Sequence, residues 1–122
     1  MLILVLLLAT SCGFVISGMD AVDIPEWAIG YWIDGFGSTV NIMDDDIVFL
    51  NHNDYSLSEM IYYDGWYVVE QNETDESWVI ILASFYSGDE IWCSLVSRGS
   101  NMLTMYMEGQ GISYESLLVK DF

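Results

Sequence analysis

The side chains that most often carry catalysis are scarce in this sequence. Its 122 residues include one histidine, His52, and two cysteines, Cys12 and Cys93. A zinc site built on several imidazoles is therefore excluded, and a Ser-His-Asp or Cys-His arrangement would have to use His52. That histidine lies in the polar stretch at residues 51–54, whose composition is typical of an exposed loop. No glycine-rich phosphate loop with a lysine is present. We therefore expect no catalytic residues and no enzymatic activity.

Carboxylates, by contrast, are abundant. The chain has 19 aspartates and glutamates against two lysines and arginines, which gives a formal net charge of −17 at pH 7. Some pair of carboxylates at the separation used for glycoside cleavage is inevitable in such a sequence, so a carboxylate-pair hydrolase is only a remote alternative. The two densest acidic clusters, residues 44–46 and 73–76, fall at expected turns and lack the spacing of an EF-hand. We interpret them as solvated charge and expect neither a metal nor another cofactor.

The distribution of charge excludes whole classes of partner. All acidic residues follow Cys12, beginning at Asp20, and only Arg98 and Lys120 oppose them. Nucleic-acid affinity comes largely from lysines and arginines that neutralise phosphates, so we expect no nucleic-acid binding. Anionic lipid headgroups are disfavoured for the same reason, and contact with a membrane would require a covalently attached lipid.

Aromatic side chains are the remaining candidates for a binding role. The chain has eight tyrosines, five tryptophans and five phenylalanines, and such rings serve equally well in a ligand cavity, in a core or on a contact surface. We single out Trp66, Trp78, Trp92 and Tyr106 as possible ligand or core aromatics. Cys93 lies in a strand-like alternation and is expected to be a small buried hydrophobe rather than a nucleophile or a ligand.

The elements that position these side chains are expected to be short strands. Turn signals rich in Gly, Asn, Asp and Ser recur at fairly even intervals, as is typical of an all-β sandwich or barrel. A strand begins near Gly30, after one helical turn at residues 25–29 in which Pro25 suits the first helical position. Asp64-Gly65 is the strongest hairpin turn, since this dipeptide adopts positive φ at low cost. The further strand candidates are residues 38–43, 47–50, 60–63, 66–71, 78–86, 90–97, 102–108 and 112–119.

The order of these segments predicts the fold class. Apolar and polar residues alternate along several of them, so one side of each strand should face a core. Consecutive hairpins with no long helix between them favour a small antiparallel up-and-down barrel of about eight short strands. The predicted fold is therefore all-β, preceded by a signal segment.

The N-terminal stretch indicates where the protein resides. An apolar run at residues 2–8 is followed by Ala9-Thr10-Ser11-Cys12-Gly13. This pattern resembles the signal of bacterial lipoproteins, in which small residues precede a cysteine that is lipidated and becomes the new N-terminus. The resemblance implies lipidation of Cys12. The run is too short to cross a bilayer as a helix.

The leader also sets the expected domain boundaries and location. We expect a signal peptide at residues 1–11, a tether at residues 12–24 and a β-barrel domain at residues 25–122. The protein would then be exported to the cell envelope and held at a membrane by its N-terminal lipid. The alternative is an ordinary cleaved signal, cut near residues 9–11 or beyond, which would release a secreted soluble protein.

A second resemblance concerns the barrel itself. Gly30-Tyr31-Trp32 places a Gly-x-Trp at the start of the first strand, after a short turn and before successive hairpins. This resembles lipocalins and lipocalin-like barrels, including small bacterial lipoproteins of that shape. The resemblance implies that a late arginine covers Trp32, for which Arg98 is the only candidate, and that the barrel binds small apolar ligands.

These observations lead to an expected function and its alternatives. We expect a cell-envelope lipoprotein whose lipocalin-like barrel binds a small apolar ligand or an envelope protein. The alternative is a structural or adhesive surface lipoprotein with no small-molecule site.

Overall fold

The computed structural model describes residues 22–50 and 55–121. The leader, Cys12 and His52 lie outside the described residues. The elements in chain order are η2 (Glu26–Ala28), β1 (Gly30–Ile33), β2 (Thr39–Ile42), β3 (Ile47–Phe49), β4 (Tyr55–Ser56), α1 (Leu57–Tyr62), β5 (Trp66–Glu73), β6 (Ser77–Ser84), β7 (Glu90–Ser97), β8 (Met102–Gly109) and β9 (Ile112–Lys120).

The strands form one sheet with the topology of an up-and-down barrel. Their order is β4-β3-β2-β1-β9-β8-β7-β6-β5, so each strand lies beside its neighbours in sequence and the first pairs with the last. The β1–β9 pair joins Trp32 to Lys120 and Ile33 to Val119. Only the hydrogen-bonded step between β4 and β5 is missing among the described strands. The prediction of an all-β, antiparallel, barrel-like fold is confirmed.

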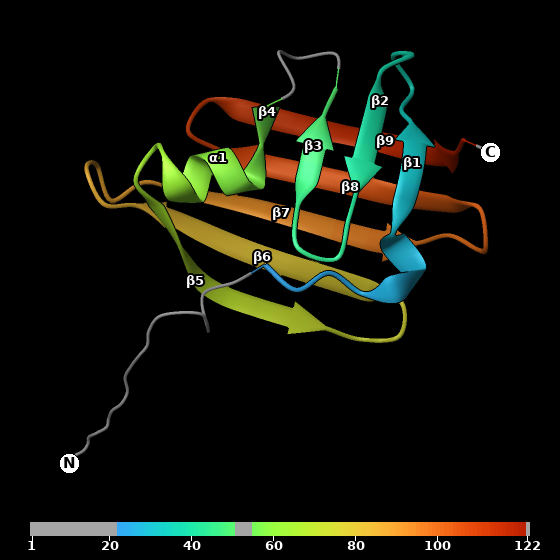
Figure 1. Ribbon diagram of the computed structural model, residues 1–122, viewed down its shortest axis with the longest axis horizontal. Coiled ribbons are helices and arrows are strands. Elements are labelled where there is room, and N and C mark those ends of the chain that lie inside the picture. The colour runs from blue at the N-terminus through green and yellow to red at the C-terminus, as the bar shows by residue number, and fades with distance from the viewer. Residues whose placement is uncertain (1–21, 51–54, 122) are drawn as a thin grey trace.

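The number of strands explains why no tight hairpin joins β4 to β5. Every neighbouring pair is antiparallel, and the sheet has nine strands, so its two outer strands must point the same way. Strands that run in the same direction cannot be joined by a tight hairpin. Helix α1 connects β4 to β5 instead and contacts both of them. The sheet therefore curls into an open barrel, in which the short strands β1, β2 and β3 run steeply across the direction of the long strands and lie over β8 and β9 in this view (Figure 1).

Helix α1 replaces a strand that the sequence predicted at residues 60–63. Its start is fixed by Ser56, whose hydroxyl accepts a hydrogen bond from the Glu59 amide at 3.2 Å. A serine followed three residues later by a glutamate is a helix-start signal, and the apolar residues Leu57 and Met60 then fall on one buried face. Gly65 keeps a turn conformation, with φ of 77°, but it leads from α1 into β5 rather than closing a hairpin.

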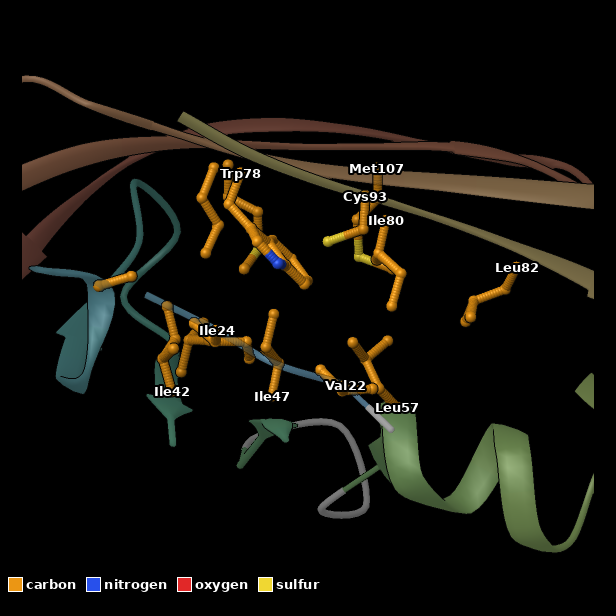
Figure 2. Packing of buried hydrophobic residues seen from close by; sticks show 14 of the residues in the cluster. Val22, Ile24, Ile42, Ile47, Leu57, Trp78, Ile80, Leu82, Cys93 and Met107 are labelled. Atoms are coloured by element: carbon orange, nitrogen blue, oxygen red, sulfur yellow. The ribbon is translucent and has the colours of Figure 1, made fainter. Parts of the chain in front are cut away.

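The folded domain includes residues before Pro25, although the tether was expected to extend to residue 24. Val22 and Ile24 are buried, while Asp23 between them is exposed, which is the alternation of an extended segment. The Ile24 amide donates to the Asp44 carbonyl at 2.9 Å. Figure 2 shows Val22 and Ile24 among the apolar side chains of the core. The last residues of the expected tether therefore belong to the domain.

One end of the barrel is closed around Trp32. Its ring is buried, and its Nε1 donates to the Ala28 carbonyl of η2 at 2.9 Å. Lys120 Nζ lies 5.2 Å from the centroid of this ring and donates to the Ile29 carbonyl at 3.0 Å. A late basic residue thus covers Trp32, but it is Lys120. Arg98 lies between β7 and β8, where its Nε donates to Thr104 Oγ1 at 3.0 Å.

Gly30 makes room for this arrangement. It has φ of 148°, and a Cβ at this position would lie 2.7 Å from Lys120 Cε. A side chain at residue 30 would therefore displace the lysine from the Trp32 ring. The Gly-x-Trp pattern has a physical reason here, because the glycine admits the cation that covers the tryptophan.

Candidate ligand-binding cavity

A cavity of about 360 Å³ lies at the end of the barrel where β1 leads into its turn with β2. Its lining comes from both crossing layers and from α1, so the curl of the sheet creates it. Apolar and aromatic side chains form most of the wall. The lining residues are Asp34, Ser38, Thr39, Val40, Phe49, Tyr55, Ser56, Met60, Trp66, Ile91, Met107, Gln110, Ile112 and Tyr114.

Strand alternation directs the apolar residues into this space. On β7, Ile91 is buried, as are Cys93 and Leu95, and the residues between them face outward. Met107 of β8 is buried in the same way and is the cross-strand partner of Cys93. The period of two therefore sends Ile91 and Met107 into the barrel interior, where they form part of the cavity wall.

Asp34 is the charged residue of the cavity wall. Its side chain is 7% exposed. Its Oδ1 accepts hydrogen bonds from the amides of Phe36 at 2.9 Å and Ser38 at 2.8 Å, and its Oδ2 accepts one from the Tyr114 hydroxyl at 2.9 Å. The two amide bonds shape the β1–β2 turn, as aspartate side chains commonly do. These neutral donors satisfy the oxygens of the buried carboxylate but bring no countercharge.

A second tyrosine of the wall is paired in the same way. The Tyr55 hydroxyl donates to Asp64 Oδ2 at 2.7 Å. The pKa values of Tyr55 and Tyr114 are both raised, first by burial and then by the hydrogen bond to the aspartate. Both phenols therefore keep their protons at neutral pH. A phenol that donates its proton to a carboxylate can offer a ligand only its lone pairs.

Basic side chains are missing from the described lining of the cavity. Arg98 is bonded to Thr104, and Lys120 covers Trp32 at the closed end of the barrel. Asp34 therefore has uncharged donors, two amides and a phenol, and no cation among its described partners. Asp64, the partner of Tyr55, is exposed and lies outside the cavity lining. The Asp34 carboxylate gives the site a negative charge, Tyr55 and Tyr114 offer acceptors, and Ser38, Thr39, Ser56 and Gln110 add neutral donors and acceptors.

The structure separates the four aromatic residues that the sequence singled out. Trp66 lines the cavity. Trp78 is fully buried in the core, and its Nε1 donates to the Asp23 carbonyl at 3.0 Å. Trp92 and Tyr106 lie outside this cavity and outside the core, because the alternation of β7 and β8 turns them outward, where Trp92 is 51% exposed. They line a second hollow, of about 570 Å³, on the outer face of the sheet, together with Glu90, Ser94, Glu108 and Gly109.

The sequence did not reveal the aspartate–tyrosine pairs. Asp34 could be recognised only as a turn residue ahead of Gly35, and its partner Tyr114 lies 80 positions away. Tyr55 and Asp64 flank α1, which was not expected. Their pairing depends on this helix, which brings residue 64 back beside β4.

Cys93 is part of the core. Its side chain is buried, and burial raises the pKa of the thiol to about 12. Because the thiolate is the nucleophile and metal ligand, a thiol of this kind is inert at neutral pH. Within residues 22–50 and 55–121, no group of three or more His, Cys, Asp or Glu side chains is placed to hold a metal ion. In the same ranges, no helix is long and apolar enough to cross a membrane.

No protein-family model, curated protein or solved structure matches this sequence at a significant level. The function of the cavity therefore has to be argued from its own geometry and chemistry.

Proposed function

We propose that this protein is a binding module whose barrel holds a small, mostly apolar ligand. The observation that carries the proposal is the cavity of about 360 Å³, walled by apolar and aromatic side chains from both layers of the barrel. Small-molecule sites have volumes of roughly 300–1,000 Å³, with apolar walls and a few convergent polar groups. The polar groups here include the hydrogen-bonded pair Asp34–Tyr114, the hydroxyl of Tyr55, and the side chains of Ser38, Thr39, Ser56 and Gln110.

The closed end of the barrel supports a lipocalin-like role. Trp32 is capped by Lys120 at one end, where Gly30 leaves space for the lysine side chain. The opposite end of β1 leads into the cavity. A barrel plugged at one end and hollow at the other can hold a ligand without letting it pass through.

The leader supports a place in the cell envelope. Under this proposal Cys12 carries a lipid and the barrel is displayed from a membrane; the alternative is a secreted barrel. Mass spectrometry of the N-terminal peptide, from protein made in a bacterial host that processes lipoproteins, distinguishes the two. A lipidated Cys12 at the N-terminus supports the anchor, and an unmodified N-terminus at another residue excludes it.

The binding proposal is tested by a titration with octanol, followed by tryptophan fluorescence. Trp66 is part of the cavity wall, so its emission should change as the ligand enters, and Trp66→Phe should abolish that change. Ile112→Trp should block entry, because Ile112 lines the cavity and is 41% exposed at its edge. Val119→Trp on the same strand is the matched control, since Val119 is similarly exposed but lies outside the cavity lining. Failure of octanol to bind the wild-type chain would refute the proposal.

A second candidate function, binding of an envelope protein, is favoured by a separate surface. Four rings are exposed near the α1–β5 and β6–β7 connections: Tyr62, Tyr63, Phe85 and Tyr86. The Phe85 amide donates to the Gly65 carbonyl at 2.9 Å, which holds the two connections together. Exposed apolar surface of this kind often marks protein contacts. Replacement of Tyr63 and Tyr86 by serine should abolish cross-linking to such a partner while octanol binding is unchanged.

A further inference from the structure

We infer that the cavity selects a ligand with a positively charged head group, namely an amphiphile that carries an ammonium on an apolar body. This inference rests on the proposed function, because it concerns the ligand of the same cavity. It is carried by the Asp34 carboxylate and by the phenols of Tyr114 and Tyr55, in a wall whose described residues include no basic side chain.

The negative charge of Asp34 has no cationic partner among the described residues of the cavity wall. Asp34 is buried, and its hydrogen-bond donors, two backbone amides and a phenol, are all neutral. These bonds satisfy the carboxylate oxygens but leave its charge uncompensated. Burial of a charge is costly unless it is paired as well as hydrogen-bonded. An ammonium entering the cavity would supply the missing countercharge in a place where water screens the attraction weakly.

The two phenols of the cavity wall also favour a ligand that donates hydrogen bonds. The phenols of Tyr114 and Tyr55 donate their protons to Asp34 and Asp64. Towards a ligand, each can therefore only accept a hydrogen bond. An ammonium has three donors and no acceptor, so it matches a set of acceptors. A carboxylate ligand has only acceptors, so it gains nothing from the two phenols and could bond only to the neutral donors of the wall, which are Ser38, Thr39, Ser56 and Gln110, beside the like charge of Asp34.

Aromatic rings in the cavity wall and the net negative charge of the chain also favour a cation. Trp66 and Phe49 present aromatic rings in the cavity wall, and the faces of such rings attract cations. The chain has a formal net charge of −17, which draws cations towards the protein and repels anions. The local and the long-range electrostatics thus favour the same sign of ligand.

The test compares three probes that share one apolar body: octylamine, octanol and octanoate. Calorimetric titration of the full chain at neutral pH should give octylamine the highest affinity, roughly tenfold or more above octanol, with octanoate the weakest. Octanol binding as tightly as octylamine, or octanoate binding more tightly, would overturn the inference and leave the proposed function intact. Failure of all three probes would instead refute the proposed function.

Variants assign the preference to its source. Asp34→Asn should lower the octylamine-to-octanol ratio of affinities to within about threefold. Tyr114→Phe keeps the carboxylate and should retain the preference for octylamine. Asp45→Asn is the charge-matched control, because Asp45 is exposed at the β2–β3 turn and lies outside the cavity lining. An equal loss of preference in the Asp45 variant would contradict a role for Asp34.

The test does not depend on the stability of one variant. If Asp34→Asn fails to fold, Asp64→Asn removes an exposed charge that Tyr55 links to the cavity wall and should lower the octylamine-to-octanol ratio of affinities only slightly. The ranking of the three probes by the wild-type chain decides the inference in either case.

Discussion

The Tyr114 hydroxyl donates to Asp34 Oδ2 at 2.9 Å and thereby joins β9, the last strand in the chain, to the turn between β1 and β2. A second bond beside it, from the Gly35 amide to Ser116 Oγ at 2.8 Å, strengthens the same connection. The two bonds fix the rim of the cavity relative to β9. Asp34 therefore shapes the site as well as charging it.

Asp34→Ala should destabilise the fold more than Tyr114→Phe does. The alanine removes the acceptor of two turn amides and leaves the phenol without its partner, for a loss of roughly 2–3 kcal/mol. The phenylalanine removes one hydrogen bond, for a loss of about 1 kcal/mol. Urea denaturation of the two variants measures the difference. Equal free energies of unfolding would show that the turn does not depend on the carboxylate.

Gly30→Ala should weaken the closed end of the barrel. The new Cβ meets the Lys120 side chain, and the backbone φ of 148° is unfavourable for alanine, so we expect a loss of about 2 kcal/mol or more. Gly99→Ala is the closer control, because Gly99 also has a strongly positive φ, 125°, but a Cβ there meets nothing within 4 Å. Thermal melting of the two variants measures the difference. A Gly99 variant as unstable as the Gly30 variant would exclude the contact with Lys120 as the cause.

Ser56→Ala should destabilise α1 by about 1 kcal/mol, because it removes the side-chain cap of the Glu59 amide. Ser58→Ala is the control, because it removes a nearby serine hydroxyl while the helix cap at Ser56 stays in place. Chemical denaturation gives both values. A loss in the Ser58 variant equal to that in the Ser56 variant would show that the cap is not what stabilises the helix.

Helix α1 also shows where sequence patterns stop being informative. β7 was predicted with the bounds that the structure gives, residues 90–97, because its alternation admits one interpretation. Residues 60–63 form a short apolar and aromatic run, which fits a strand as well as a helix, and the Ser56–Glu59 signal decides between them. The aromatic candidates divided for another reason. Composition marks a ring as important, but only the strand register decides whether it faces inward, as Trp66 does, or outward, as Trp92 does.

The candidate site was harder to predict than the fold. Apart from β1 and β9, paired strands follow one another in sequence, so local turn signals indicate their pairing. The wall of the cavity instead joins residues from distant parts of the chain, such as Asp34 and Tyr114. Their contact depends on the curl of the whole sheet, which no local pattern encodes.

Cys93 should make the stability of the protein depend on pH in the alkaline range. The pKa of the folded thiol is about 12, against an ordinary value of 9.0, so the unfolded chain loses this proton first. The contribution is fully present below pH 9 and is lost as the pH rises towards 12, at about 1.4 kcal/mol per pH unit. Denaturation at several alkaline pH values should show a shallower decline for Cys93→Ala. Equal slopes would mean that this thiol ionises in the folded state.

Methyl NMR of the full chain, labelled at isoleucine and methionine and titrated with octanol, tests most directly whether the cavity binds a ligand. Ile91 and Met107 line the cavity, whereas Ile42 and Ile47 are buried in the core outside its lining. We predict that the signals of Ile91 and Met107 shift in a saturable manner while those of Ile42 and Ile47 remain in place. Signals of Ile91 and Met107 that stay unchanged up to the solubility limit of octanol would contradict the existence of a ligand-binding cavity.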